Sequence, residues 1–315
     1  MSYQSLRIIF MGTPEFAVAS LEALVNAGCN IVAVITAPDK PAGRGMELQQ
    51  SAVKTYAVQQ QLNILQPEKL KQAEFIDRLR LLNADLQLVV AFRMLPELLW
   101  NMPAMGTINL HGSLLPQYRG AAPINWAVIN GERETGVTTF KLQHEIDTGN
   151  ILMQESFPIG AEETAGEVHD RMKEIGAQLL LSTVKGLSNG TLREKPQHAI
   201  NTVDGVLHHA PKIFTETCQV NWNKTAREIH NLIRGLSPYP TAFTFLNEKK
   251  LKIYKGIVIV DNAGSGNSEV PGTVQTDHKT YLRFAAADGY ISVTDLQLEG
   301  KKRMNVTDFL RGYRF

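Results

Sequence analysis

The chain has 315 residues, of which 43% are hydrophobic and 20% are charged. This composition excludes disordered and collagen-like proteins, and the length predicts two domains rather than one. The 32 basic and 31 acidic side chains leave a net charge of +1, so the chain as a whole shows no sign of nucleic-acid binding. The isolated cysteines Cys29 and Cys218 are typical of free thiols, and we find neither a signal peptide nor an apolar run of about 18 residues. We therefore expect a cytoplasmic protein.

Short β-rich runs alternate with helical patterns in the first half of the chain, which is typical of a parallel-rich sheet covered by helices. The strands are expected at residues 6–10, 31–36, 63–65, 86–91, 107–110, 137–142 and 151–157. After the first strand we expect a helix with Thr13 as its N-cap, Pro14 as its first residue and Gly28 at its end. The fold class predicted for this half is α/β.

The second half of the chain has a different pattern. A long helix is expected at about 164–186, a linker at 196–223, and a shorter helix at 224–234 that ends before the Pro238-Tyr239-Pro240 stretch. From 241 to 298 the chain contains only short β-rich runs separated by turn signals, which predicts a small β-barrel.

Charge divides unevenly between these two regions. Residues 1–206 carry 17 basic and 21 acidic side chains, and residues 207–315 carry 15 basic and 10 acidic ones, so the net charges are −4 and +5. A basic β-barrel is a common nucleic-acid platform, but a charge of this size is equally compatible with a solvated surface.

Two stretches carry the residues best suited to chemistry. Asn109 and His111 belong to one expected strand and project on the same face, because side chains in a strand alternate with period two. Asp147 follows the next strand, in a turn with Thr148 and Gly149. Adjacent strand ends would thus deliver a carboxamide, an imidazole and a carboxylate. The residues alone leave a structural alternative, with a turn cap, a satisfied histidine and an ordinary turn carboxylate.

Three stretches together resemble the signature of the 10-formyltetrahydrofolate-dependent formyltransferases: Asn109-Leu110-His111, the loop from Ser113 to Gly120, and Asp147-Thr148-Gly149. Five segments resemble in particular the branch of this family that acts on methionyl-tRNA: residues 10–16, 38–45, 221–222, 238–240 and 300–302. The resemblance covers essentially the whole chain. It implies a Rossmann-like catalytic domain at 1–206 and an OB-like β-barrel at 207–315 that binds tRNA.

The resemblance also implies the site residues, with Asn109, His111 and Asp147 as the catalytic group. The folate site is implied to be lined by Val90, Ala91, Phe92, Arg93, Met94, Leu95, Ser113, Leu114, Leu115 and Pro116. Family members commonly carry a Tyr-Gly pair where this chain has Phe92-Arg93, so we expect the contacts of the folate pocket to differ.

The implied reaction transfers a formyl group from 10-formyltetrahydrofolate to methionyl initiator tRNA by direct attack of the amine. Asn109 would donate a hydrogen bond to the oxyanion, His111 would donate to it or carry the proton, and Asp147 would orient the imidazole. The resemblance places a tRNA contact on Arg44 in the basic loop that also carries Lys40. The candidate contacts in the barrel are Lys249, Lys250, Lys252, Lys301, Lys302 and Arg303. We expect no metal and a monomer.

Other functions compete with this one. A formyltransferase for an amino sugar nucleotide or for glycinamide ribonucleotide would use the same trio, but Gly112 stands where the glycinamide enzymes carry proline, and a small substrate does not need a basic barrel. A dehydrogenase is disfavoured because the turn around Gly12 lacks the GxGxxG pattern. All three proposed catalytic side chains are present, and only an activity assay distinguishes an enzyme from a catalytically inactive folate-binding module.

Overall fold

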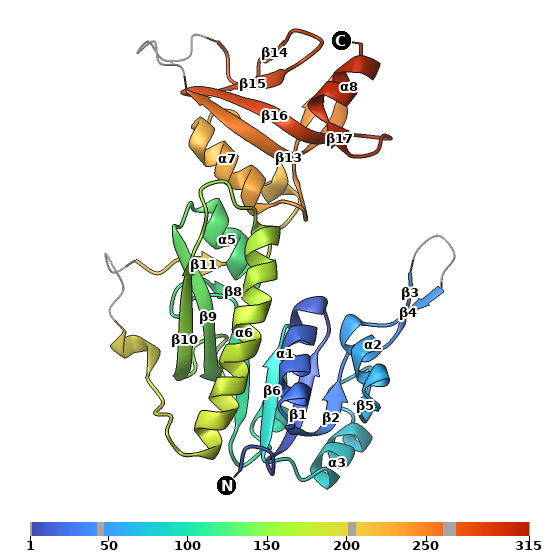
Figure 1. Ribbon diagram of the computed structural model, residues 1–315, viewed down its shortest axis with the longest axis vertical. Helices are drawn as coiled ribbons and strands as arrows, with labels where there is room; N and C mark the ends of the chain where they lie inside the picture. The colour runs from blue at the N-terminus through green and yellow to red at the C-terminus, as the bar shows by residue number, and fades with distance from the viewer. Residues whose placement is uncertain (1, 43–46, 201–205, 261–268, 315) are drawn as a thin grey trace. The chain divides into compact units, whose positions relative to one another are not determined.

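A computed structural model of the chain describes residues 2–42, 47–200, 206–260 and 269–314 (Figure 1). The chain forms two compact units. Unit 1 comprises Met1–Arg119, Gly136–Phe157 and His169–His208, and unit 2 comprises Gly120–Thr135, Pro158–Val168 and His209–Phe315. The chain thus contributes to unit 2 twice before it remains there from His209 onward.

Unit 1 is built on a seven-stranded sheet of order β10-β9-β7-β6-β1-β2-β5. Its strands are β1 (Arg7–Gly12), β2 (Asn30–Ile35), β5 (Ile64–Leu65), β6 (Leu86–Val90), β7 (Thr107–His111), β9 (Glu134–Lys141) and β10 (Ile151–Pro158). Strands β5, β2, β1, β6 and β7, which are neighbours in this order, are parallel, whereas β9 is antiparallel to β7. The predicted parallel-rich α/β fold is confirmed, and the expected strands are present close to their predicted bounds.

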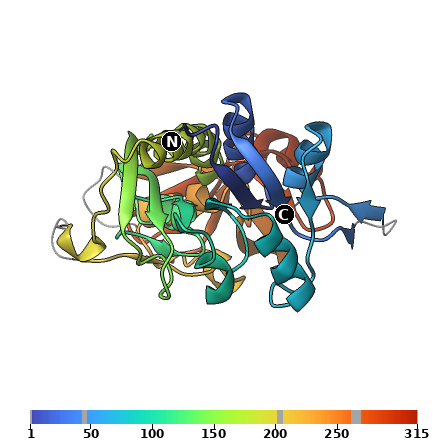
Figure 2. The ribbon, with the colours of Figure 1, turned by 90° about the horizontal axis from the view of Figure 1, so that it is seen from below.

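Helices cover both faces of this sheet. On one face α6 (Ala165–Ser188) brings Gly176 against Leu110 and Val137, and α1 (Glu15–Asn26) lies beside it through the ion pair of Glu15 with Lys173. The helix α2 (Ala52–Gln59) packs against α1. On the other face lie α3 (Ala73–Leu81) and α4 (Glu97–Trp100) (Figure 2). These two helices share a hydrophobic core with side chains of β1, β2 and β6.

The start of α1 differs from the prediction. The helix begins at Glu15, and Pro14 is the N-cap residue with an extended backbone, so Thr13 lies outside the helix and Pro14 before its first residue. No side chain caps this end. Proline satisfies both positions equally well, because its missing N–H removes one of the unpaired donors of the first turn.

Unit 2 is built on a six-stranded antiparallel sheet, which forms a half-barrel. Its order is β12-β13-β16-β15-β14, with β17 paired to β16. The helix α7 packs against β13 and the helix α8 against β16. The elements of unit 2 are α5 (Pro123–Ile129), β11 (His209–Ala210), α7 (Ala226–Gly235), β12 (Ala242–Leu246), β13 (Lys249–Val260), β14 (Val274–Thr276), β15 (Leu282–Ala286), β16 (Gly289–Leu298), β17 (Met304–Asn305) and α8 (Val306–Gly312).

Local sequence explains two of these elements. Helix α7 begins with a capping box, in which the Thr225 side chain accepts from the Glu228 N–H and the Glu228 carboxylate accepts from the Thr225 N–H. The Thr225 hydroxyl also donates to the Glu228 carboxylate, and the hydrogen bonds that this carboxylate accepts from the hydroxyl and the N–H of Thr225 lower the pKa of Glu228 to about 2. The turn between β12 and β13 places Asn247 and Glu248 at φ values of 47° and 64°, as a two-residue hairpin of type I′ requires.

In the part of the chain that the structure describes, no helix is long and apolar enough to cross a membrane.

Candidate active site

Strand β7 presents Asn109 and His111 on the same face of the unit 1 sheet. Asn109 is half-buried, and among the described residues its carboxamide has no hydrogen-bond partner. His111, at the end of the strand, is only 6% exposed. In register, Asn109 lies beside Val89 of β6, whose side chain belongs to the core shared with α3 and α4. The strand fixes the backbone of Asn109, and among the described residues the N–H groups of its carboxamide have no partner.

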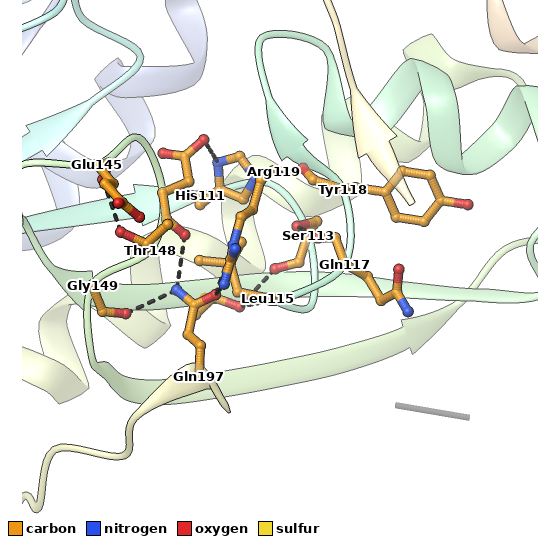
Figure 3. Close-up of polar contacts among 12 residues, drawn as sticks. His111, Ser113, Leu115, Gln117, Tyr118, Arg119, Glu145, Thr148, Gly149 and Gln197 are labelled. Carbon is orange, nitrogen blue, oxygen red and sulfur yellow. Dashed lines mark hydrogen bonds and ion pairs between the residues drawn. The ribbon is translucent and has the colours of Figure 1, made fainter. Parts of the chain in front are cut away.

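The His111 imidazole is fixed by contacts at both nitrogens (Figure 3). Its Nε2 lies 2.9 Å from the backbone oxygen of Tyr118, and because a carbonyl only accepts, Nε2 carries a hydrogen. Its Nδ1 lies 3.9 Å from Oδ2 of Asp147. The ring also packs edge-on against Phe140, with centroids 6.4 Å apart. Nδ1 is thus the nitrogen at which a carboxylate can stabilise an added proton.

Asp147 reaches His111 by a route that the sequence did not indicate. Strand β9 runs antiparallel to β7, with His111 opposite Thr138 and Ile108 opposite Lys141, so the end of β9 lies beside the start of β7. The expectation of adjacent strand ends at one edge was therefore wrong. The loop after β9 returns across the sheet, with Asp147 at a φ of 55°.

Glycine is required in this returning loop at position 149. A Cβ on Gly149 would lie 1.7 Å from the backbone oxygen of Lys141, far inside van der Waals contact. The Thr148 hydroxyl donates to the Glu145 oxygen at 3.0 Å and closes the turn from the other side. The Asp147-Thr148-Gly149 sequence is thus the form that the tight return demands.

The loop after β7 is held by hydrogen bonds that occupy its polar groups. The Ser113 hydroxyl donates to the Gln117 oxygen at 2.6 Å, and Thr138 Oγ1 both donates to the Ser113 oxygen and accepts from the Leu115 N–H. Of the predicted folate-site residues in this loop, Ser113, Leu115 and Pro116 are buried and Leu114 is half-buried. These side chains shape the loop rather than present polar groups to a ligand.

The segment after β6 adjoins a cleft of about 690 Å³. Because Val90 pairs with Leu110, Ala91 just after β6 and His111 at the end of β7 lie at the same edge of the sheet. This edge is the place where open α/β sheets bind their ligands. The cleft is lined by Thr13, Pro14, Ala37, Pro38, Asp39, Lys40, Glu68, Ala91, Phe92 and Arg93.

The predicted folate-site residues after β6 differ in their accessibility. Val90 is fully buried in its strand and Leu95 is buried, whereas Met94 is 74% exposed. Arg93 donates to the backbone oxygens of Glu68 and Pro67 and is therefore turned to the cleft wall. Side-chain contacts with a ligand in this segment are open to Ala91 through Met94.

The loop with Asp147 also contacts the segment after β6. Exposed His144 lies with its Nδ1 3.7 Å from Oε2 of Glu97, at the start of α4. The contact brings the loop with Asp147 beside the start of α4.

The candidate tRNA contacts lie in both units. In unit 1, Lys40 is exposed in β3 (Lys40–Ala42), which pairs with β4 (Glu47–Gln49), while Arg44 lies outside the described residues. Asp39, next to Lys40, is held by Lys54 and Gln66. The base of this hairpin is therefore anchored.

The two basic clusters of unit 2 lie at the same end of the β13–β16 pair, because Leu251 is opposite Leu298. Lys250 and Lys252 share a face of β13, and Lys249 points to the other face. Lys301 and Lys302 are exposed just beyond β16. The charge of Arg303 is instead paired with Asp295 and stacked over Tyr254, so Arg303 is committed within the unit.

The chain matches known proteins over nearly its full length. A family model described as formyl transferase matches residues 6–184, and one described as formyl transferase, C-terminal domain, matches residues 212–314. The methionyl-tRNA formyltransferase of Phocaeicola vulgatus is 55% identical over 320 residues, covering 100% of this chain and 98% of its own. That of Bacteroides fragilis is 51% identical over 314 residues, covering 99% and 97%. The chain belongs to the methionyl-tRNA formyltransferase family.

Solved structures support the fold of this formyltransferase. An N-formyltransferase from Helicobacter canadensis, in complex with folinic acid and dTDP-3-aminofucose, has a TM-score of 0.65 at 21% identity and covers 95% of this chain and 100% of its own. HypX from Aquifex aeolicus, in complex with tetrahydrofolic acid, has a TM-score of 0.64 at 17% identity, covering 97% of this chain and 47% of its own. At these identities the likeness shows a shared fold only.

Two parts of the site escaped the sequence reasoning about this formyltransferase. Thr138 and Gln154 fix the loop after β7, and Gln197 contacts the Asp147 turn from 50 residues away along the chain. The one sequence signal that could have identified Thr138, Gln154 and Gln197 is a polar side chain at a position predicted to be buried.

Among the described residues no group of three or more His, Cys, Asp or Glu could hold a metal ion.

Proposed function

We propose that the chain transfers the formyl group of 10-formyltetrahydrofolate to the α-amino group of methionyl initiator tRNA. The observation that carries this proposal is that Asn109, whose carboxamide has no partner among the described residues, shares a strand face with His111, whose Nδ1 lies 3.9 Å from Asp147. The cleft, which other residues line, lies at the same edge of the sheet. The identity to methionyl-tRNA formyltransferases over the full chain supports the choice of acceptor.

The chemistry needs no protein nucleophile. An α-amino group has a pKa of about 7.7 to 8.0, so part of it is neutral at pH 7 and attacks the formyl carbon directly. The carbonyl oxygen then becomes negative, the amine nitrogen loses a proton, and the folate nitrogen leaves. The protein must therefore stabilise an oxyanion and accept and return a proton.

Each of the three residues fits one of these tasks. The Asn109 N–H groups, which have no partner among the described residues, donate to the oxyanion. His111 holds one hydrogen at Nε2 against Tyr118 and can take a second at Nδ1, facing Asp147. Asp147, with Oδ2 3.9 Å from Nδ1, keeps the ring oriented.

The cleft suits the formyl donor in size and lining. Its volume of about 690 Å³ lies within the range of small-molecule sites, roughly 300 to 1,000 Å³. Ala91 and Phe92 offer apolar surface, and Arg93 and Lys40 offer positive charge for the carboxylates of a folate. We propose that folate contacts come from the segment Val90–Leu95, with the loop from Ser113 to Pro116 as the wall that shapes the site.

The basic residues of both units are proposed to bind the tRNA. Residues 207–315 would form the tRNA-binding domain, with Lys250 half-buried over the ring of Phe243 at 4.1 Å and Phe245, 50% exposed, opposite it on β12. An exposed aromatic ring beside lysines suits nucleic-acid binding, because a base can stack on the ring while the lysines contact neighbouring phosphates. Lys40 and Arg44 are proposed to reach the acceptor end, and residues 1–206 to carry catalysis in a monomeric protein.

The test is a formylation assay with 10-formyltetrahydrofolate and charged initiator tRNA. We expect formylmethionyl-tRNA to form, and the same protein to leave a dTDP-linked amino sugar unmodified. Formylation of the sugar in place of the tRNA would overturn the proposed acceptor. Loss of product in Asn109→Ala, with unchanged folding, would tie the activity to this site.

A further inference from the structure

Gln197 is a buried glutamine whose carboxamide bridges two loops of the candidate active site. It lies in the 3₁₀ turn η1 (Gln197–Ala199) and is 4% exposed. Its Nε2 donates to the backbone oxygens of Asp147 and Gly149, both at 2.8 Å. Its Oε1 accepts from Nε and Nη2 of Arg119, at 3.0 and 2.6 Å (Figure 3). Both amide hydrogens and the amide oxygen are thus used, and they can be replaced by no other side chain without loss.

The backbone just before Gln197 is anchored to the sheet. The Lys195 N–H donates to the Ile151 oxygen and the Ile151 N–H donates to the Lys195 oxygen, each at 2.8 Å. This pairing places Gln197 beside the start of β10, which directly follows the Asp147 loop. The glutamine is therefore a fixed support for the turn and does not simply follow it.

The same stretch of chain holds the other partner of the imidazole. The Tyr118 N–H donates to the His208 oxygen at 2.7 Å, and the two rings stack with centroids 5.6 Å apart. The Gln117 side chain donates to the Val206 oxygen at 2.7 Å and accepts from the His208 N–H at 2.8 Å. We call residues 195–200 and 206–208 the strap, because they bind both the Asp147 turn and the loop with Tyr118.

The conformation of the held residues explains why a support is needed. Tyr118 and Asp147 have φ values of 59° and 55°, in the left-handed region that costs energy for residues other than glycine. Tyr118 offers its oxygen to His111 Nε2, and Asp147 faces Nδ1 at 3.9 Å. The spacing of the pair thus depends on two strained loops, and a displacement of about 1 Å in such a site can lower turnover about 100-fold.

We propose that Gln197 is a positioning residue for formyl transfer, which holds Asp147 opposite His111 by joining the Asp147 turn to Arg119. The proposal rests on the proposed function of the His111–Asp147 pair. Gln197 touches neither reacting group, and it acts on the rate through the carboxylate. Substrate binding, which uses the cleft and the basic residues, does not depend on it.

The test compares Gln197→Leu and Gln197→Glu with Gln87→Leu. Gln87 is a buried glutamine of the same unit, on β6 beside the start of β7 rather than the end. Gln197→Glu keeps the size and the contact with Arg119 but cannot donate to two carbonyl oxygens. We expect both Gln197 variants to lower kcat at least tenfold, with KM for tRNA and for the folate within twofold, and Gln87→Leu to keep kcat within twofold.

A second arm asks whether the loss passes through Asp147. In an Asp147→Asn background, single-turnover formylation should fall less than threefold when Gln197→Leu is added, because the charge to be positioned is already gone. A full tenfold further loss would overturn the proposal, as would a normal kcat in both single variants. If Gln197→Leu fails to fold, the near-isosteric Gln197→Glu decides by the same criteria.

A measurement without turnover separates this proposal from the proposed function. Amide hydrogen exchange of residues 143–150 should be faster in Gln197→Leu than in the unsubstituted protein, and unchanged in Gln87→Leu. Exchange that does not change would overturn the positioning role. An unsubstituted protein that fails to formylate methionyl-tRNA, with exchange responding as expected, would instead overturn the proposed function.

Discussion

The sharpest consequence of the site geometry is that Asn109→Ala should remove activity without affecting stability. The Asn109 carboxamide is half-buried, and within the described part of the chain it makes no hydrogen bond. Truncation to alanine therefore breaks no side-chain hydrogen bond within the described part of the chain. We expect the free energy of unfolding to change by no more than about 0.5 kcal/mol, as for a substitution away from the core.

The expected loss of activity is much larger. A side-chain donor to a tetrahedral oxyanion is worth about 2.7 to 4 kcal/mol, which corresponds to about 100- to 1,000-fold in kcat. Asn109→Asp keeps the shape but replaces the donor by a negative charge. Its kcat should therefore be at least as low as that of Asn109→Ala.

The assay measures formylation under saturating tRNA and folate, together with urea unfolding of the same preparations. Asn63→Ala is the matched control, because the Asn63 side chain donates to the Val32 oxygen just before β5, which is separated from β7 in the sheet by β2, β1 and β6. It should lose stability and keep kcat. Turnover in Asn109→Ala within threefold of the unsubstituted protein, at equal stability, would refute the assignment of the oxyanion donor.

Three further predictions follow from charge. Asp147→Asn should lower kcat and change its pH profile, since the charge facing His111 Nδ1 at 3.9 Å is lost; an unchanged profile would leave Asp147 as a turn residue only. Replacing Lys249, Lys250 and Lys252 by alanine should reduce the slope of log affinity for tRNA against log salt concentration by about 0.7 to 0.9 per lost phosphate contact. A slope equal to that of Arg303→Ala would contradict tRNA binding by these three lysines. The pKa of Glu228 is lowered to about 2 by its hydrogen bonds to Thr225, so its stabilising effect is complete above about pH 4.5, the ordinary value, and is lost as the pH falls toward 2. Thermal unfolding of Glu228→Gln should lack this part of the acid dependence.

The sequence predicted those parts of the site that depend only on residues close together in the chain. The period of a strand is enough to place Asn109 and His111 on one face, and the turn residues around Asp147 predicted a tight loop. The direction of β9 could not be predicted, because the residues of a strand buried on both faces read alike in either direction. The same holds for Gln197, which meets Asp147 only through tertiary pairing.

Short elements and exact helix ends were the other features that the sequence did not predict. Helix α8 has seven residues and an Asn305 side chain that accepts from the Asp308 N–H, so its start carried a visible N-cap signal. A length of two turns leaves too little apolar periodicity to register it as a helix. The position of Pro14 was missed for a related reason, since proline fits the N-cap and the first turn alike.

The extent of the strap bears on how formyltransferases can exchange domains. The family model for the catalytic part ends at residue 184, yet Gln197 and the His208 oxygen complete the surroundings of Asp147 and Tyr118 within the same compact unit. A recombination joint between relatives at residue 184 would join these loops to a strap from another protein, whereas a joint after His208 would transfer the loops with Tyr118 and Asp147 together with their supports. Chimaeras made at the two joints should therefore differ in turnover even when both fold, and natural gene fusions of this domain should tolerate breaks after the strap better than breaks before it.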